Sequence, residues 1–450
     1  MPHNALLILH EYHEKVGTIR DHVDAIIGCK AANVVKSDCS IADQVNLSKF
    51  DIVIFHYSLV VALPSYVSPK LRRNIAAFKG LKILFIQDEY RWIDKTADAI
   101  RELGIRVVFS LCNANIVRKV YHHPWCDAVR FEYTLTGFAS DELCRLPVPA
   151  YSDRRLDVTY RARRLNSWMG YHTIQKWQIA DRFLVDSNRF GLKVDISTRE
   201  QDRLYGSKWI ELVSDARAVL GTESGASVCD FTGDIQVKAE AYLQRKPDAT
   251  YEELKEKFFA DVDGKITMNV ISPRCFEAAA LRTLMIMYPG EYAGILIPSK
   301  HYVVLQPDHS NIEDVLAILR SPDKAMAIID AAYDDIAKSG LWRLSALSAH
   351  LDRVINEEMN ALAAPRTKLA AITGTPDSFK AARREVERVK RNAAISPMVK
   401  LRKFTNNLVL VAADAIDRLP QPLRRTVRPL AAWSYHRTKQ LVRSVLPGSN

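Results

Sequence analysis

The sequence predicts an α/β protein with two domains, each built on a parallel sheet, followed by a basic helical extension at its C-terminal end. Three observations lead to this prediction. Short apolar segments alternate with amphipathic helical patterns over 1–150, and this alternation is typical of parallel sheets covered by helices. A second series of the same kind occupies 151–345. From 346 to 450 the pattern is helical, and Lys and Arg accumulate toward the end.

Length and composition support a folded globular chain. The protein has 450 residues, enough for about three domain-sized units. Hydrophobic residues make up 48% and charged residues 26%, which excludes a mainly disordered chain. The seven cysteines form no C-x-x-C pair, which disfavours a zinc ribbon and favours a reducing compartment. No secretory signal pattern opens the chain, so we expect a cytoplasmic protein.

Four short apolar runs predict the strands of the first domain, at 5–9, 51–55, 81–86 and 106–110. Helical patterns lie between the later ones, at 69–78 and 93–103, and Gly104 closes the second helix. Polar side chains follow the strand ends, among them His10, Asp88 and Glu89. Open parallel sheets bind ligands at that edge, so these residues are candidates for chemistry.

A proline-containing linker at 146–150 precedes the second series. Strands are predicted at 156–160, 191–196, 216–221 and 283–287, and helices at 171–182, 251–260 and 273–281. Ser272 and Pro273 have the residue types of an N-cap and a first helical position. The helix that follows therefore begins at a defined place.

Three blocks of the second series resemble the donor domain of GT-B glycosyltransferases, in particular bacterial enzymes like families 1 and 4. The signature resemblance is at 271–283, with Arg274, Phe276 and Glu277, and it continues at 288–292. Residues 157–163 resemble the opening strand and loop of that domain, and 220–227 resemble a middle block. The first domain resembles the family only in its alternation of strands and helices.

The resemblance implies two Rossmann-like domains facing a cleft, with the acceptor on 1–150 and the nucleotide-sugar donor on 151–345. A diphosphate needs cations and free N–H groups, and both occur at a helix N-terminus that carries arginine. In the family, the glutamate matched by Glu277 accepts hydrogen bonds from the ribose hydroxyls. The expected donor-binding residues are Arg161, Arg163, Glu223, Ser224, Arg274, Glu277, Glu291 and Tyr292.

Plainer interpretations stay open for these residues. Glu277 is also compatible with an exposed helix charge, and Arg161, Arg163 and Arg164 with a solvated loop. The segments 223–225 and 291–292 are equally compatible with simple turns.

The catalytic group is less defined than the donor site. Retaining relatives carry a second glutamate eight positions before the one matched by Glu277, and here that position is Asn269. The stereochemistry of transfer therefore stays open. An inverting reaction needs a base for the acceptor hydroxyl. Asp88 and Glu89 are the best-placed candidates, followed by His10, and Glu11, His13 and His56 were also considered.

No cofactor and no metal are expected, because arginines and a helix terminus are able to neutralise a leaving diphosphate. Asp261 and Asp263 have D-x-D spacing, but Gly264 favours a turn there. P-loop, dinucleotide-binding and nucleophile-elbow motifs are missing.

The charge is unevenly distributed. Residues 366–450 contain 18 Lys+Arg and 5 Asp+Glu, a net +13, whereas the whole chain carries +11. A basic amphipathic tail suits an anionic membrane surface, such as the inner face of the plasma membrane. A helix packed on the body and a solvated extension are the alternatives. We do not expect nucleic-acid binding, because no base-reading motif is present.

Together these features predict a peripheral glycosyltransferase that acts on a glycan or lipid-linked acceptor in polysaccharide or glycoconjugate biosynthesis. A nucleotide-sugar epimerase of the same fold is one rival. A non-catalytic nucleotide- or glycan-binding scaffold docked through the tail is another.

Overall fold

The computed structural model describes residues 4–11, 17–363 and 376–395. Residues Met1–Val386 form one compact unit, and Glu387–Asn450 form a second. Both sheets of the fold belong to the first unit. None of the helices in the described ranges combines the length and apolar character needed to cross a bilayer.

The first sheet has six parallel strands in the order β2-β1-β3-β4-β5-β6. Its strands are β1 (Ala5–His10), β2 (Asn33–Asp38), β3 (Ile52–Phe55), β4 (Leu81–Phe85), β5 (Val107–Ser110) and β6 (Arg130–Tyr133). The central strands are buried along their full length. Continuous apolar runs are typical of strands covered on both faces, which is why the sequence pattern found four of the six.

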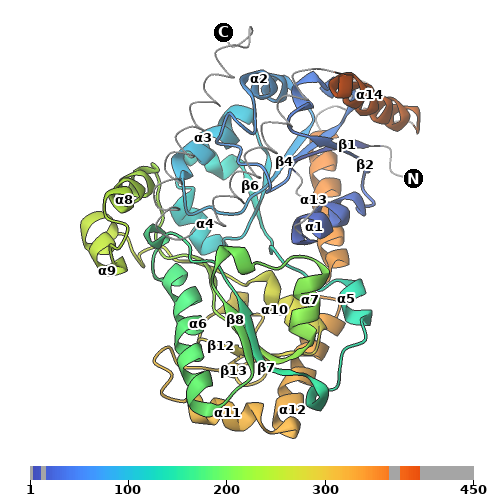
Figure 1. The fold of residues 1–450 in the computed structure, drawn as a ribbon. Helices are drawn as coiled ribbons and strands as arrows, with labels where there is room; N and C mark the ends of the chain where they lie inside the picture. The colour runs from blue at the N-terminus through green and yellow to red at the C-terminus, as the bar shows by residue number, and fades with distance from the viewer. Residues whose placement is uncertain (1–3, 12–16, 364–375, 396–450) are drawn as a thin grey trace. The chain divides into compact units, whose positions relative to one another are not determined.

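Helices connect the strands of the first sheet, as Figure 1 shows. They are α1 (Gly17–Ile27), α2 (Pro69–Ala77), α3 (Ile93–Leu103) and α4 (Ala114–Val120). The helices predicted at 69–78 and 93–103 are confirmed, and Gly104 ends α3 in the left-handed conformation. The strands β2 and β6 were missed because polar residues interrupt their apolar character.

The second sheet has five parallel strands in the order β13-β12-β9-β7-β8. The strands are β7 (Leu156–Arg161), β8 (Val194–Ser197), β9 (Ala216–Gly221), β12 (Leu284–Met287) and β13 (Val303–Val304). Its helices are α6 (Tyr171–Phe190), α7 (Ser207–Ser214), α10 (Pro273–Ala280), α11 (Ile312–Leu319) and α12 (Pro322–Ala332). The prediction of two parallel sheets covered by helices is confirmed, whereas the boundaries 1–150 and 151–345 stay a prediction.

Between β9 and α10 the chain forms an insertion with its own small core. It contains an antiparallel pair, β10 (Ser224–Ala226) with β11 (Met268–Val270), and two helices, α8 (Asp234–Arg245) and α9 (Tyr251–Leu254). Phe259 and Leu254 pack there with Trp168 and Met169, which lie just before α6. The insertion therefore supports the beginning of α6.

Helix α13 (Leu344–Ala363) differs from its predicted place at the start of a C-terminal extension. Leu347, Leu351, Val354 and Ile355 are buried in the core of the first sheet, against residues such as Ile54. Fully burying an aliphatic side chain contributes about 1.5–3 kcal/mol. Helix α13 is therefore part of the N-terminal core.

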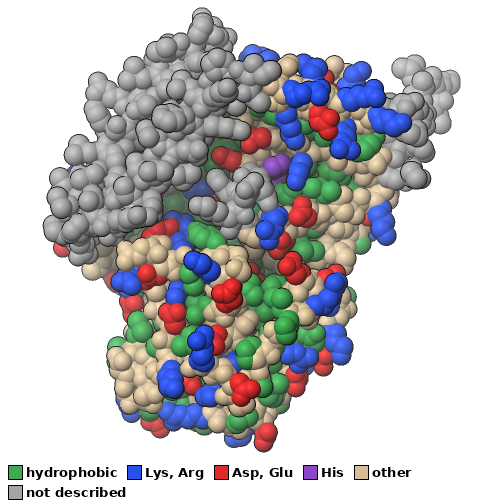
Figure 2. Space-filling view, turned by 45° about the vertical axis from the view of Figure 1, so that its right-hand side comes forward, with side chains coloured by type: hydrophobic (Ala, Val, Ile, Leu, Met, Phe, Trp, Pro, Cys, Tyr) green, Lys and Arg blue, Asp and Glu red, His purple; other side chains and the backbone are tan. Residues whose placement is uncertain are grey.

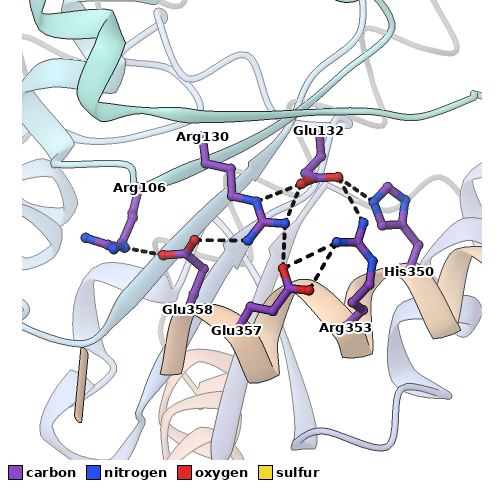
Figure 3. Close-up of polar contacts among 7 residues, drawn as sticks. All are labelled: Arg106, Arg130, Glu132, His350, Arg353, Glu357 and Glu358. Atoms are coloured by element: carbon purple, nitrogen blue, oxygen red, sulfur yellow. Dashed lines mark hydrogen bonds and ion pairs between the residues drawn. The ribbon is translucent and has the colours of Figure 1, made fainter. Parts of the chain in front are cut away.

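A charge network joins α13 to β6 (Figure 3). Glu132 accepts from His350 at 2.7 Å and pairs with Arg353 at 3.2 Å. Arg130 joins Glu357 at 2.7 Å and Glu358 at 3.2 Å, and Glu358 also contacts Arg106. These pairs specify the register of the helix along the sheet.

The extension predicted at 346–450 is described only in part. Helix α14 (Pro376–Ile395) is present, and 364–375 and 396–450 lie outside the described residues.

Candidate functional site

Helix α10 begins at the position that the sequence predicted. The Ser272 side chain accepts from the backbone N–H of Arg274, and Pro273 occupies the first turn. Gly137 lies against this turn, since a Cβ there would come within 2.4 Å of the Pro273 Cα. At the other end of α10, the buried Arg154 donates to the carbonyls of Leu281 and Arg282. Both ends of the helix are therefore held in place.

Arg274 extends from α10 to the carboxyl end of β7. Its Nη2 donates to the Arg161 carbonyl at 2.6 Å. Its guanidinium lies over the rings of Tyr160 and Trp209, at 5.0 and 5.3 Å from their centroids. The buried Nε has no hydrogen-bond partner among the described residues, and none of their carboxylates pairs with this arginine.

Glu277 lies one turn along α10 from Arg274. Its Oε2 accepts from the Trp209 Nε1–H at 2.7 Å. Burial raises the pKa of this carboxyl, while Trp209 and Arg274 oppose the shift and Asp21 of α1 adds to it. A partly desolvated carboxylate beside a cation is suited to accept hydroxyl hydrogens.

Lys176 on α6 is the second cation of this region. Burial, and then the neighbouring Arg274, lower the pKa of its ammonium to about 8, and Asp88 opposes that shift. A pKa depressed in this way indicates that no carboxylate in the described part of the chain fully compensates the charge.

His172 lies one turn before Lys176, near the N-terminus of α6. Its side chain is buried, and its Nδ1 has no hydrogen-bond partner in the described ranges. Burial lowers the pKa of its imidazole to about 4, and the neighbouring Asn269 opposes that shift. The Asn269 Oδ1 is also buried without a partner there. Buried polar atoms are normally satisfied, so this pair is suited to receive ligand hydroxyls.

The arginines after β7 are engaged by carboxylates. Arg161 pairs with Asp195 at 2.8 Å and also donates to the Asp202 carbonyl. Arg163 pairs with Glu200 at 2.9 Å, and Arg164 pairs with Asp181 at 2.6 Å. Acidic and basic side chains alternate over much of the surface in Figure 2. The charges of Arg161 and Arg163 are thus already paired with carboxylates of the protein. Their donor-binding role stays a prediction.

Glu223 is buried and accepts from the backbone N–H groups of Glu291 and Tyr292, at 3.0 and 2.7 Å. Gly290 permits this approach, because a Cβ there would come within 2.7 Å of the Glu223 carboxyl carbon. Ser224 belongs to β10 and pairs with Val270.

Tyr292 is fully buried, and its hydroxyl donates to the Tyr288 carbonyl. Tyr292 also begins a short 3₁₀ turn, which ends at Gly294, and the Glu291 side chain is exposed. The structure therefore places these two residues in a turn, and their donor-binding role stays a prediction.

The first sheet contributes Asp88, Glu89 and His10 in three different settings. Asp88 has a left-handed backbone (φ 47°), lies 3.6 Å from Arg91, and is near enough to Lys176 to affect its pKa. His10 is buried at the end of β1 beside His56.

Glu89 points into a buried network. It accepts from the hydroxyls of Ser110 and Tyr121 and from the Leu111 N–H, at 2.8 to 3.1 Å. Burial raises the pKa of its carboxyl to about 7 against these donors. Of the three predicted catalytic residues, Asp88 is thus the one that the structure brings to the cations of the second sheet.

The two sheets meet at these strand ends within Met1–Val386. The loop after β4 pairs with the insertion, since the Asp230 N–H donates to the Tyr90 carbonyl and the Asp94 N–H donates to the Phe231 carbonyl. Asp21 affects Glu277, and Asp88 affects Lys176, across the same boundary. Asp21 of α1 and Asp88 of the loop after β4 thus approach Glu277 on α10 and Lys176 on α6, respectively.

Metal ligation is not indicated at this site or elsewhere in the described ranges. No three His, Cys, Asp or Glu side chains there are grouped to hold a metal ion. The expectation that no metal or cofactor is needed stays a prediction.

Sequence reasoning missed Lys176, Trp209 and His172. Each lies within a helical pattern where lysine, tryptophan or histidine is ordinary. The available signal was weak, namely a lysine and a histidine in the first turns of a helix that follows the predicted donor-domain strand.

No protein-family model and no curated protein matches this chain. Among solved structures, it is similar to an alpha-glucosyltransferase in complex with UDP, with 9% identity and a TM-score of 0.47 over 78% of this chain and 99% of that one. It is similar to the DNA-modifying enzyme beta-glucosyltransferase, with 14% identity and a TM-score of 0.47 over 78% and 98%. It is also similar to Anabaena HepE in complex with UDP and glucose, with 10% identity and a TM-score of 0.46 over 79% and 100%.

Proposed function

We propose that this protein is a GT-B-type glycosyltransferase that moves a sugar from a nucleotide-sugar to an acceptor. The observation that carries the proposal is the group formed by Arg274, Lys176 and Glu277. Arg274 and Lys176 form no ion pair in the described ranges, and Arg274 lies one helical turn from Glu277, a carboxylate with a single hydrogen-bond donor. A nucleoside diphosphate carries anionic phosphates, which suit the two cations, next to a ribose, whose hydroxyls suit the carboxylate.

In this proposal Arg274 and Lys176 bind the diphosphate and stabilise it as a leaving group. Charge developing on the leaving oxygen is stabilised best by cations that are already in place. Glu277 accepts from the ribose hydroxyls. His172 and Asn269 lie next along α6 and β11, where the glycosyl unit would follow the phosphates.

The acceptor would approach from the first sheet. Asp88 is the preferred base, because it is the acidic candidate that affects the pKa of Lys176. His10 and Glu89 are the alternatives, and the buried hydrogen bonds of Glu89 make it the less accessible of the two.

The similarity to family 1 and family 4 enzymes, a glycan or lipid-linked acceptor, polysaccharide biosynthesis and attachment to an anionic membrane are the finer parts of this proposal. The described part of α14 supports attachment, because its exposed side chains include six cations: Lys380, Arg383, Arg384, Arg388, Lys390 and Arg391. Truncation after Pro365 should abolish sedimentation with anionic vesicles. Equal sedimentation of both forms would refute membrane docking by the tail.

The proposed activity is tested by binding and turnover with the full chain. Thermal-shift measurements with UDP, GDP, ADP and their sugars should show one stabilising nucleoside diphosphate, and Arg274→Ala should abolish that shift. Hydrolysis or transfer of the matching nucleotide-sugar then measures turnover. An altered sugar formed from the donor alone would identify an epimerase, and binding without turnover on any acceptor would identify a scaffold.

A further inference from the structure

Trp209 touches both of the α10 residues on which the proposed donor site depends. It lies on α7 and is partly buried. Its indole N–H donates to Glu277, and its ring stacks on the Arg274 guanidinium. Because Arg274 and Glu277 are three residues apart on one helix, their side chains share a face, and a single indole reaches both.

The Arg274 side chain is held from several directions. The buried Tyr160 ring and the Trp209 ring both contact the guanidinium, and the Arg161 carbonyl accepts from one of its nitrogens. A guanidinium over an aromatic face is attracted by the negative face of the ring. The buried Nε–H has no hydrogen-bond partner among the described residues, so the cation is oriented and keeps a donor for a ligand.

The Glu277 carboxylate is held by a single contact. Trp209 is its one hydrogen-bond donor in the described ranges, and it occupies one position on Oε2. A carboxylate offers about four acceptor positions, and an indole can only donate. Trp209 therefore fixes the plane of the carboxylate and leaves positions for two further donors, which is the number that a vicinal diol supplies.

We propose that Trp209 is a positioning residue that orients Glu277 toward the ribose diol while its ring sets Arg274 for the diphosphate of the same nucleotide. This inference rests on the proposed function. It makes recognition of the ribose hydroxyls depend on the indole N–H, whereas contact with the diphosphate depends only on the ring.

The test compares two probes on the full-length protein. Calorimetry gives the Kd of the tightest binder among UDP, GDP and ADP and the Kd of its 2′,3′-dideoxy analogue. In the wild type, the ribonucleotide should bind about tenfold or more tightly, the effect of hydrogen bonds to a charged group. In Trp209→Phe this ratio should fall to within about threefold, with the Kd of the dideoxy probe almost unchanged.

Two further variants make the outcome decisive. Trp177→Phe is the matched control, since Trp177 stacks on Arg164 at 4.8 Å and lies on another helix of the same half. In Trp177→Phe, the ratio of the Kd of the dideoxy probe to the Kd of the ribonucleotide should equal the wild-type ratio. Replacement of Trp209 by 3-benzothienylalanine removes the N–H but retains the shape of the ring, so it gives the same test if Trp209→Phe is unstable.

A ratio that does not change in the Trp209 variants, or equal weakening of both probes, would overturn the positioning role, because a purely structural residue affects the two probes alike. If the wild type binds none of the three nucleoside diphosphates, the proposed function itself fails, and this inference fails with it.

Discussion

Two groups of cations near the carboxyl end of β7 have opposite environments. Arg161, Arg163 and Arg164 follow the strand directly, and each has a carboxylate partner within 3 Å. Arg274 and Lys176 come from α10 and α6, and no ion pair engages them in the described part of the chain. A cation's place in the sequence therefore does not determine whether its charge is available to a ligand. Its partners decide that, and they come from other elements.

The buried Glu89 and the half-buried Glu277 show the same contrast. Glu89 accepts from three donors, the Ser110 and Tyr121 hydroxyls and the Leu111 N–H. Glu277 has one, from Trp209. A carboxylate that is already saturated by the protein stabilises the fold, whereas one with open acceptor positions is able to recognise a ligand.

The strongest test of the cation comparison is Arg274→Ala beside Arg163→Ala. Loss of Arg274 should weaken binding of the preferred nucleoside diphosphate by about 100-fold or more, because a partly buried charge-assisted contact is removed. Loss of Arg163 should change the Kd by less than about threefold, since it is exposed and paired with Glu200. Calorimetry measures both, and equal weakening would show that ion pairing does not decide availability.

The carboxylate comparison predicts a stability effect for Glu89→Gln. The folded pKa of about 7 lies above the ordinary 4.5. Between these values the unfolded chain loses the proton while the folded chain keeps it, so stability falls as pH rises through this window. The Glu89 carboxyl alone should lower the free energy of unfolding by about 3 kcal/mol as pH rises through this window. Urea unfolding at about pH 4.5 and pH 8 should show a smaller fall in Glu89→Gln than in the wild type.

In Glu277→Gln the fall in unfolding free energy between about pH 4.5 and pH 8 should be closer to the wild-type value than it is in Glu89→Gln. Nucleotide binding should weaken in Glu277→Gln instead. If Glu89→Gln abolishes turnover but does not alter the pH dependence of unfolding, then Glu89 is catalytic and its assignment as a structural carboxyl is wrong.

The network of Figure 3 extends the comparison to charges that serve the fold alone. Glu358→Ala should lower the free energy of unfolding by about 2 kcal/mol, because the side chain is 9% exposed and joins Arg106 and Arg130 to α13. Arg353→Ala, at 51% exposure, should change it by less than about 0.5 kcal/mol. Neither variant should alter the nucleotide Kd, and a change there would connect α13 to the donor site.

The smallest expected effect is the uptake of a proton by Lys176 when a nucleoside diphosphate binds. Above about pH 8 the Lys176 ammonium is mostly neutral, and a bound diphosphate would restore its charge. Binding at about pH 9 should therefore take up as much as one proton, and affinity should decline as pH rises through 8. Calorimetry in buffers of different ionisation enthalpy measures the uptake. Lys176→Arg, which stays charged, should abolish it, and uptake that persists in this variant would assign the proton to another group.

Apolar runs and caps predicted much of the fold. Both series of strands, the helix that begins at Pro273 and the left-handed end of α3 at Gly104 agree with the structure. The interrupted strands β2 and β6 and the place of α13 could not be predicted. Their burial depends on neighbours that are distant along the chain, as Leu351 and Ile54 are.

The sequence by itself determined where Arg274 and Glu277 would stand, because a serine cap followed by proline starts a helix at one residue and the helical repeat then sets their common face. Only the tertiary structure decided that Arg161 is neutralised by Asp195, that Lys176 comes beside Arg274, and that Trp209 donates to Glu277. Cap and repeat are local properties of the backbone, whereas a charge acquires its environment from side chains that meet only when the chain is folded.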